Sequence, residues 1–423
     1  MGMTLTEKII AAHCGAEHVA PGQFVTAKVD FALANDITAP LAIESFRKMG
    51  ATTVFDPSRV ALTPDHFTPN KDIKAATQAK IMREFAREQR VVHYFEVGRA
   101  GIEHVTLVEQ GLTLPGEIVI GADSHTTTYG AVGAFAAGVG SADLAAVLAA
   151  GEIWLMVPAT IRVEMTGKLR RWTSGKDVIL TLIGRLGVDG ATYKALEFCG
   201  PAIAALALDD RLTMANMAIE AGAKNGVFPA DDVVLDYFRT RAARPFRPQY
   251  ADPDAAYEAT IPLDVSAIVP VVAMPHLPSN VKPAAEARDI RIDQVVIGSC
   301  TNGRFTDMET AAKILRGNKI APDVRVIVIP GSMEIYRRCL DAGFIADFVD
   351  AGAFVSGPTC GPCLGGHMGV LAEGERALAT TNRNFLGRMG HKTSEVYLCG
   401  PAVAAASALT GKITSPEEIG GAA

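Results

Sequence analysis

Residues 292–302 read IDQVVIGSCTN, and this stretch gives the strongest indication of the fold. Its first part, 292–298, has the length and the β-branched side chains of a strand, and it ends just before Cys300. A helical pattern follows at 306–315, and the next apolar run is 324–329. Strands that alternate with helices in this way are typical of a parallel sheet with helices on both faces. Ligands bind beyond the carboxyl ends of the strands in such sheets, so Cys300 lies where a site is expected.

The same alternation extends over the rest of the chain. Strands are favoured at Val29–Leu33, Thr52–Phe55 and Glu117–Ile120, whereas Lys74–Gln89 has the apolar spacing of a helix. A proline-rich stretch without clear periodicity, 269–288, favours a connector. Further helices are expected at 40–49, 141–150, 176–186, 214–223 and 333–342, and further strands at 159–166 and 353–355. We therefore predict an α/β protein with mostly parallel sheets and three domains, at 1–158, 159–283 and 284–423.

The composition argues against several classes of protein. The chain has 423 residues, of which 49% are hydrophobic, and this is enough for large buried cores. Its net charge of −6 argues against a nucleic-acid binder, which would need a basic surface to neutralise phosphates. Neither a secretory leader nor an apolar run of about 18 residues is recognised, so a cytoplasmic protein is expected. The seven cysteines argue against a disulfide framework, because they are odd in number in a long chain.

Three of the cysteines form a candidate metal site. Cys360 and Cys363 form a C-x-x-C pattern, and such a turn at a helix start brings two sulfurs to the same side. Together with Cys300 they would leave one iron of a cubane cluster without a protein ligand, able to act as a Lewis acid. The residues alone leave a redox pair and a structural zinc site open as alternatives. Cys339 falls within an expected helix and is interpreted as a buried hydrophobic residue rather than a fourth ligand.

Histidines, acidic residues and arginines in loop-like contexts form a second candidate group. A histidine that is oriented by a carboxylate serves as a general acid or base near neutral pH. Arginine forks bind carboxylates through paired hydrogen bonds. Each residue alone also fits a surface or capping role. The candidates are Asp65, His66, His104, Asp123, Ser124, His125, Asn216, Glu220, Asn382, Arg383 and Arg388.

Taken together, four motifs resemble those of the aconitase superfamily, in the same order along the whole chain. The family's cluster ligands occupy G-S-C-T-N and G-P-x-C-G-P-C-x-G, which are 298–302 and 357–365 here. Its D-S-H-T motif is Asp123–Thr126, and its N-R-N-F-x-G-R motif is Asn382–Arg388. The resemblance implies three α/β domains around a central 4Fe-4S cluster, one per subunit, with one iron not bound by the protein. The cluster ligands that it implies are Cys300, Cys360 and Cys363.

The resemblance also implies roles for the second group of residues. The expected reaction is the elimination of water and its re-addition with the opposite regiochemistry, with His66 protonating the departing hydroxyl. The pairs expected are Asp65 with His66, Asp123 with His104, and His125 with Glu220. The residues expected to hold the substrate carboxylates are Ser124, Arg383 and Arg388, and those expected near the cluster and its water are Asn216 and Asn382.

Two departures from the aconitases that act on citrate narrow this expectation. The chain ends at Ala423, before the fourth domain that carries the catalytic base in those enzymes. The resemblance therefore implies the large subunit of a split enzyme, with a separate small subunit that supplies the base and the specificity loop. Pro40 takes the place of a glutamine that contacts the substrate, which disfavours citrate.

The split members of the family act on small hydroxy-acids. The leading expectation is a hydro-lyase that isomerises 2-isopropylmalate and 3-isopropylmalate in leucine biosynthesis. Homoaconitate, 2,3-dimethylmalate and methylmalate stay open as alternative substrates. A non-catalytic, metal-stabilised subunit and an RNA-binding relative are remote alternatives, and the acidic charge disfavours the second. Neither nucleic acid nor a membrane is expected as a partner.

Overall fold

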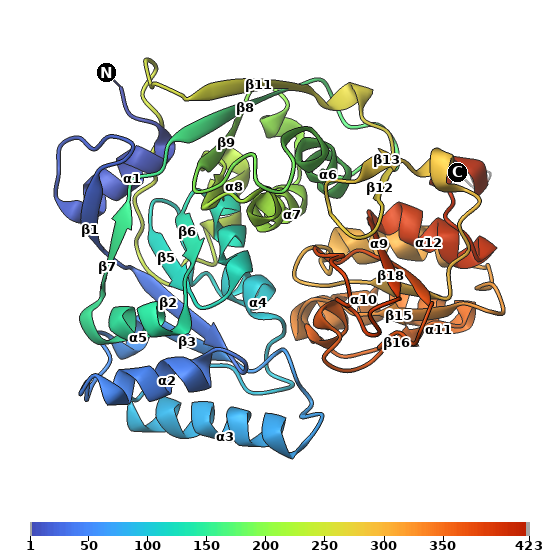
Figure 1. The fold of residues 1–423 in the computed structure, drawn as a ribbon, viewed down its shortest axis with the longest axis horizontal. Coiled ribbons are helices and arrows are strands. Elements are labelled where there is room, and N and C mark those ends of the chain that lie inside the picture. The colour runs from blue at the N-terminus through green and yellow to red at the C-terminus, as the bar shows by residue number, and fades with distance from the viewer. Residues whose placement is uncertain (1, 420–423) are drawn as a thin grey trace. The chain divides into compact units, whose positions relative to one another are not determined.

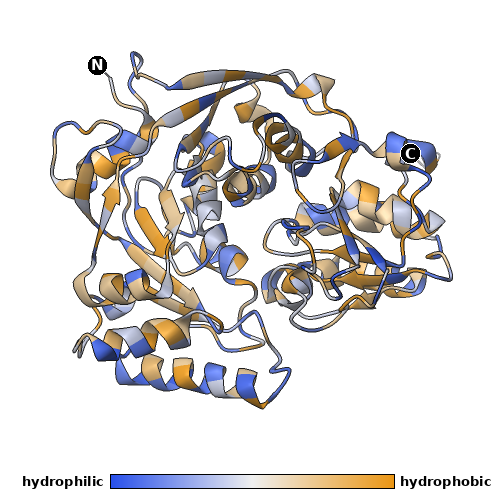
Figure 2. Cartoon of the chain, in the orientation of Figure 1, coloured by the Kyte–Doolittle hydropathy of each residue, from blue (hydrophilic) through white to orange (hydrophobic). Residues whose placement is uncertain are grey.

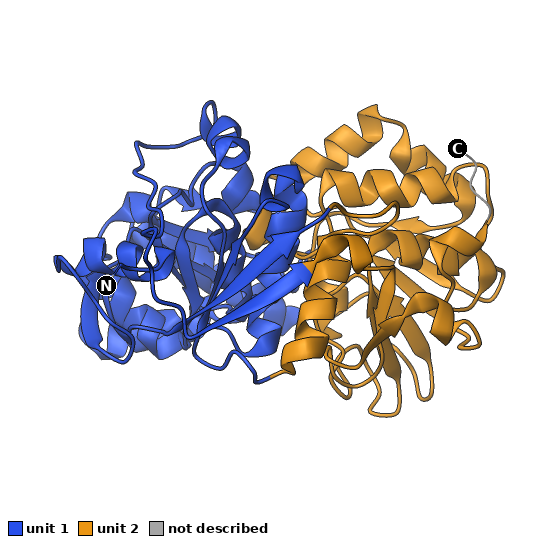
Figure 3. Cartoon of the chain, turned by 90° about the horizontal axis from the view of Figure 1, so that it is seen from above, with its two compact units in different colours: residues 1–97, 106–167, 189–263 blue, residues 98–105, 168–188, 264–423 orange. Residues whose placement is uncertain are grey.

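The computed structural model describes residues 2–419 (Figure 1). The chain divides into two compact units, which Figure 3 colours separately. Unit 1 comprises the chain up to Val97 together with 106–167 and 189–263, and unit 2 comprises 98–105, 168–188 and the chain from Asp264 onward. Both units combine helices with largely parallel sheets, which confirms the predicted fold class. The boundaries of the three expected domains stay a prediction.

The first sheet of unit 1 is parallel throughout, in the order β4-β3-β2-β5-β6. The central strands β2 and β5 are buried along their whole length, as expected of parallel strands that are covered on both faces. The strands are β2 (Phe31–Asn35), β3 (Val60–Thr63), β4 (His93–Tyr94), β5 (Ile118–Gly121) and β6 (Phe135–Gly138). The associated helices are α2 (Ala39–Lys48), α3 (Ile73–Glu88), α4 (Glu103–Glu109), whose first residues belong to unit 2, and α5 (Ser141–Ala150).

Helix α3 shows how the sequence specifies these elements. Asp72 accepts a hydrogen bond from the backbone N–H of Ala75 and caps the helix. Its buried residues recur on one face, among them Ala79, Met82 and Phe85, and Figure 2 shows hydrophobic and hydrophilic residues alternating along it. The helix that was predicted at 74–89 is thereby confirmed.

The predicted strand at Thr52–Phe55 is wrong, and the strand of this region is β3 instead. The backbone N–H of Val54 donates to Oε1 of Gln89 at 2.9 Å rather than to a neighbouring strand. The backbone N–H of Phe55 donates to the carbonyl of Leu148 in helix α5 at 2.7 Å. These tertiary contacts use the hydrogen-bonding groups that a sheet would need, and short apolar runs do not reveal them.

The rest of unit 1 contains a second, four-stranded sheet in the order β10-β9-β8-β11 and a two-stranded antiparallel pair of β1 with β7. These strands are β8 (Thr160–Thr166), β9 (Ala195–Cys199), β10 (Asn225–Val227), β11 (Ala259–Asp264), β1 (Phe24–Lys28) and β7 (Glu152–Met156). The helices are α1 (Leu5–Cys14), α7 (Leu208–Met217) and α8 (Asp232–Phe238), and the 3-10 turns are η1 (Pro57–Arg59), η2 (Ser124–Val132), η3 (Ile203–Ala205) and η4 (Ala218–Ala221).

Unit 2 is built on a seven-stranded sheet in the order β13-β12-β18-β17-β14-β15-β16. Its strands β14 to β18 pair in parallel, and β12 joins them antiparallel. The strands are β12 (Val271–Ala273), β13 (Val281–Pro283), β14 (Gln294–Ile297), β15 (Arg325–Val328), β16 (Phe354–Val355), β17 (Arg376–Ala379) and β18 (Glu395–Cys399). The helices are α6 (Gly175–Leu186), α9 (Phe305–Leu315), α10 (Met333–Asp341), α11 (Phe344–Ala351) and α12 (Pro401–Thr410), and the 3-10 turns are η5 (Val265–Ala267), η6 (Ala284–Ala287), η7 (Gly361–Leu364) and η8 (Pro416–Ile419).

Two features of unit 2 differ from the sequence-based expectations. The predicted connector at 269–288 contains β12 and β13, which extend the large sheet. These strands were not predicted because they are short and prolines stand within or close to them, which leaves little periodicity. Helix α10 and the strand pair β14 and β15 agree with the prediction to within a few residues. Within residues 2–419, no helix has both the length and the apolar character that crossing a membrane requires.

Candidate functional site

In unit 1, acidic and histidine side chains gather where three neighbouring parallel strands end. Asp36 follows β2, the pair Asp65 and His66 follows β3, and Asp123 follows β5. Because β3, β2 and β5 are adjacent in the sheet, their carboxyl ends bring these residues to the same edge. The structure thus brings together three of the predicted site residues with Asp36, which was not predicted from the sequence.

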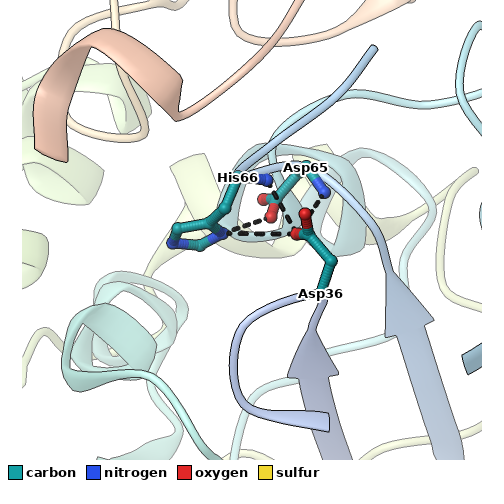
Figure 4. Close-up of side chains that lie close together, drawn as sticks. All are labelled: Asp36, Asp65 and His66. Atoms are coloured by element: carbon teal, nitrogen blue, oxygen red, sulfur yellow. Dashed lines mark hydrogen bonds and ion pairs between the residues drawn. The ribbon is translucent and has the colours of Figure 1, made fainter. Parts of the chain in front are cut away.

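His66 and Asp65 form a short, buried pair (Figure 4). His66 Nδ1 lies 2.6 Å from Oδ1 of Asp65, and His66 Nε2 lies 3.7 Å from Oδ2 of Asp123. The carboxylate of Asp36 accepts hydrogen bonds from the backbone N–H groups of Asp65, His66 and Phe67, at 3.0, 2.8 and 2.8 Å. Asp36 therefore fixes the backbone of the loop, while Asp65 orients the ring.

The surrounding carboxylates make His66 a cation at neutral pH. Burial alone would lower the pKa of His66, but the charges of Asp65, Asp123 and Asp36 and the hydrogen bond to Asp65 outweigh burial and raise it to about 10. A positively charged imidazole in such a setting is a proton donor. The geometry is that of a general acid whose tautomer and orientation are set by a carboxylate.

This pKa predicts how the stability of the fold depends on pH. Because the folded-state pKa of His66 lies above the ordinary 6.5, protonation of His66 stabilises the fold. The contribution is complete below pH 6.5 and is lost as the pH rises toward 10. We expect the difference in unfolding free energy between the wild type and His66→Gln to shrink over this range, measured by urea unfolding at several pH values. A difference that is constant from pH 6.5 to pH 10 would contradict the prediction.

A second histidine pair lies on the same loop as Asp123. Asp123 caps the 3-10 turn η2 by accepting a hydrogen bond from the backbone N–H of His125 at 2.8 Å. His125 Nε2 lies 2.9 Å from Oε1 of Glu220, and both side chains are buried. The predicted pair of His125 with Glu220 is therefore present in the structure as a contact. Glu220 lies in η4 rather than on the same helix as Asn216, because helix α7 ends at Met217.

The remaining predicted residues of unit 1 have different surroundings. Asn216 is fully buried, and its Nδ2 donates to Oγ1 of Thr128 at 2.8 Å, so it supports the η2 turn. Ser124 is the first residue of η2 and is partly buried. His104 is buried in α4, with Nε2 3.6 Å from Oε1 of Glu103. His104 belongs to unit 2 and Asp123 to unit 1, and their predicted pairing stays a prediction.

In unit 2, the three candidate ligand cysteines also follow strands of one sheet. Cys300 follows β14, and Cys360 directly precedes the 3-10 turn η7, which follows β16. The backbone N–H of Cys363 donates to the carbonyl of Cys360 at 3.0 Å, which closes the C-x-x-C turn as expected. All three side chains are buried.

Polar side chains from the loop that follows a third strand, β17, contact these cysteines. Asn382 follows β17 and places Nδ2 3.3 Å from Cys300 Sγ and Oδ1 3.4 Å from Cys363 Sγ. Arg388 Nε donates to the carbonyl of Cys363 at 2.9 Å, and its Nη2 lies 4.0 Å from Cys363 Sγ. Arg383 is partly buried beside Asn382 in the same loop. The structure therefore brings together Cys300, Cys363, Asn382 and Arg388.

Gly298 lets the backbone just before Cys300 pass close to Ile329 at the end of the sheet. Its φ is +113°, and a Cβ at this position would lie 1.9 Å from the carbonyl oxygen of Ile329. We expect Gly298→Ala to lower the free energy of unfolding by more than about 1 kcal/mol and to reduce metal content, measured by urea unfolding and metal analysis. Gly317→Ala is the matched control, because Gly317 also has a positive φ but no atom within 4 Å of an added Cβ. Equal stability losses in the two variants would contradict this account of Gly298.

The cysteine set fits an iron–sulfur cluster better than a structural zinc site. A structural zinc ion normally has four protein ligands. Cys300, Cys360 and Cys363 supply three buried thiols, the number that leaves one iron of a 4Fe-4S cluster open. Cys339 is buried in α10, and burial raises the pKa of its thiol to about 12, so it stays protonated. This confirms the interpretation of Cys339 as a hydrophobic residue.

Two residues of these sites, Asp36 and His367, were not predicted from the sequence. Asp36 could have been found, because it directly follows a buried strand, as the selected residues do. His367 is harder to predict, because its place follows from contacts within the folded loop. Its Nε2 lies 3.1 Å from Oγ1 of Thr359, and a Cβ added to Gly361 would lie 2.2 Å from that nitrogen. His367 thus packs directly against the turn between Cys360 and Cys363.

Known proteins match this chain over almost its whole length. The family described as "Aconitase family (aconitate hydratase)" matches residues 7–411. The "3-isopropylmalate dehydratase large subunit" of Moorella thermoacetica is 64% identical over 419 residues, with 99% of this chain and 100% of that protein covered. The proteins of the same name from Desulfitobacterium hafniense and Syntrophus aciditrophicus are each 60% identical, with the same coverage. Among solved structures, Thermococcus kodakaraensis aconitase X (holo-form) aligns with a TM-score of 0.49 and 12% identity, over 90% of this chain and 93% of that one.

Proposed function

Because the chain belongs to the aconitase family, we propose that it is the large, cluster-binding subunit of a hydro-lyase that interconverts 2-isopropylmalate and 3-isopropylmalate in leucine biosynthesis. Curated relatives with the name 3-isopropylmalate dehydratase large subunit are 56–64% identical to it and are covered in full. The observation that carries the chemistry is the 2.6 Å contact of His66 with Asp65. It supplies the proton donor that the elimination of water requires.

His66 is the proposed acid of the reaction. Asp65 holds Nδ1, so the proton on Nε2 is the one available to a departing hydroxyl. The raised pKa keeps His66 charged until it has given this proton away. Asp36 keeps the loop in place through three backbone hydrogen bonds. The roles of Asp123 with His104, and of His125 with Glu220, are proposed as further acid–base pairs.

Cys300, Cys360 and Cys363 are the proposed ligands of a 4Fe-4S cluster. The donor set of three buried cysteines fits such a group, and it would leave one iron without a protein ligand. When bound, the cluster supplies a Lewis acid that polarises the substrate hydroxyl and a carboxylate. Asn382 contacts two of the sulfurs and keeps Cys300 and Cys363 in position.

Substrate carboxylates are proposed to bind to Arg383, Arg388 and Ser124. Arginine binds a carboxylate through two parallel hydrogen bonds, and this fixes the substrate orientation. Arg388 is already held at the cysteine loop through the carbonyl of Cys363. Asn216 supports the η2 turn that carries Ser124.

A separate small subunit is proposed as the partner. The curated relatives are named as large subunits, which implies a second chain in their enzymes. We place the base that removes the substrate proton, and the loop that selects the side group, on this second chain. The large chain alone is then inactive.

The substrate is tested with the complex of this chain and its small partner, purified without oxygen. We expect the highest kcat/KM with 3-isopropylmalate, followed through the absorbance of the unsaturated acid, and much lower values with homoaconitate, 2,3-dimethylmalate and methylmalate. Preference for one of the other three acids would reject the proposed substrate but keep the reaction class. No turnover of any of the four by a complex that contains iron and sulfide would reject the hydro-lyase itself.

A further inference from the structure

Lys176 is a buried lysine that the chemistry proposed above does not use. It lies in the first turn of helix α6, and its side chain is completely buried. Its Nζ donates to the carbonyl oxygens of Thr380 and Thr381 at 2.9 and 2.5 Å. These two residues directly precede Asn382, which contacts Cys300 and Cys363.

The position of this charge is unfavourable unless an anion compensates it. Removing an ammonium group from water costs free energy that neutral carbonyl groups only partly offset. The N-terminus of a helix carries a partial positive charge, so a lysine in the first turn is repelled rather than attracted. Within residues 2–419, Lys176 forms no ion pair with a carboxylate. The neighbouring Asp177 instead accepts hydrogen bonds from Ser174 and Val271.

The sulfur atoms of unit 2 are a source of compensating charge, beside the carboxylates of Asp177 and Asp307. Burial lowers the pKa of Lys176 to about 8. Negative charge on nearby groups would raise this pKa, and these groups are Cys399, Cys363, Asp307 and Cys300. Burial raises the pKa of the Cys399 thiol far above its ordinary value, so Cys399 stays neutral. The Asp307 carboxylate accepts hydrogen bonds from Asn302 and the backbone of Arg304. Cys300 and Cys363 become permanent thiolates once they bind a metal.

We propose that Lys176 is the buried counter-charge of the cluster site and a positioning residue for the loop that carries Asn382. Its two hydrogen bonds fix the backbone before Asn382, and its positive charge balances the net negative charge of a cluster bound by thiolates. This inference rests on the proposed cluster but not on the identity of the substrate. A positive charge near a cluster stabilises the reduced, more negative form and raises the reduction potential.

The test compares Lys176→Met with the wild type in the complete complex, loaded with its cluster without oxygen. Iron and sulfide content are measured first in both proteins, so that a cluster missing from the wild type, which would refute the proposed cofactor, is recognised separately. We expect the midpoint potential, followed by electron paramagnetic resonance, to become more negative by at least the equivalent of a tenfold change in the redox equilibrium, about 59 mV for one electron. An unchanged potential at equal cluster content would overturn the proposal.

A second measurement uses the stability of the chain with and without its cluster. The lost hydrogen bonds to Thr380 and Thr381 weaken both forms of Lys176→Met equally. The lost attraction weakens only the loaded form, so the rise in Tm on cluster loading should be smaller in the variant. An equal rise in both proteins would also overturn the proposal.

Matched variants separate the charge of Lys176 from its structural role. Lys176→Arg keeps the charge and should keep the wild-type potential, whereas Lys176→Gln keeps a donor without charge and should behave like Lys176→Met. Lys224→Met is the control in unit 1, because Lys224 donates to the carbonyl of Gly138 and contacts no cysteine. If neither neutral variant folds without the cluster, the apo fold itself needs the charge, and the proposal is wrong.

Discussion

Replacing Cys363 by serine should remove the iron–sulfur cluster and lower turnover by roughly 10³-fold or more, because a bound Lewis acid contributes several kcal/mol to the transition state. The serine hydroxyl is a poor ligand for iron. Cys363 Sγ also donates to Oδ1 of Asn382 and accepts from Nη2 of Arg388, and these contacts orient both side chains. Iron and sulfide analysis together with kcat of the complex measures both effects.

The control for this variant is Cys339→Ala. Cys339 is as deeply buried and belongs to the same unit, but it lies in α10 and is not a proposed ligand. Cys339→Ala should keep iron, sulfide and turnover near the wild-type values, with some loss of stability from the smaller side chain. A variant Cys363→Ser that keeps its sulfide, or a Cys339→Ala that loses it, would show that the ligand assignment is wrong.

Replacing His66 by glutamine should lower kcat by about 10²–10⁴-fold while the cluster stays bound, as expected for the loss of a general acid. Glutamine retains a polar side chain of similar length but cannot deliver a proton. His66 is not a proposed cluster ligand, so iron and sulfide content should not change. The measurement is kcat at several pH values, together with metal analysis of the same preparation.

His13→Gln is a matched control for His66→Gln. His13 also forms a short pair with a carboxylate, at 2.6 Å from Asp30, and its pKa is also raised by that partner against the effect of burial. It lies in α1, and no catalytic role is assigned to it. Turnover should stay unchanged in His13→Gln, so a large loss in both variants would point to a general effect of removing histidine pairs on the fold.

Much of the site could be predicted because its residues follow strands. Cys300 and Asp123 come directly after apolar runs, and parallel sheets present such positions along one edge. Asp65 and His66 were selected from their loop and from the resemblance, although the strand before them was expected several residues too early. The error did not affect the site, because β3 ends where the loop begins.

Residues that act through tertiary contacts were not predictable in the same way. Lys176 stands in a short polar stretch at a helix start, and lysine in such a place is ordinarily exposed. Only the packing of α6 against Thr380 and Thr381 reveals that its side chain is buried. Strands β12 and β13 were hidden for a related reason, since both are short and prolines stand within or close to them, at Pro270, Pro275 and Pro283.

We propose that this chain binds a catalytic iron–sulfur cluster through three cysteines. The most direct test is the content of iron, acid-labile sulfide and zinc in the chain prepared without oxygen. We predict iron and sulfide in equal amounts, close to one 4Fe-4S cluster per chain, with negligible zinc. A stoichiometric amount of zinc without sulfide would contradict the claim and leave Cys300, Cys360 and Cys363 as a structural site.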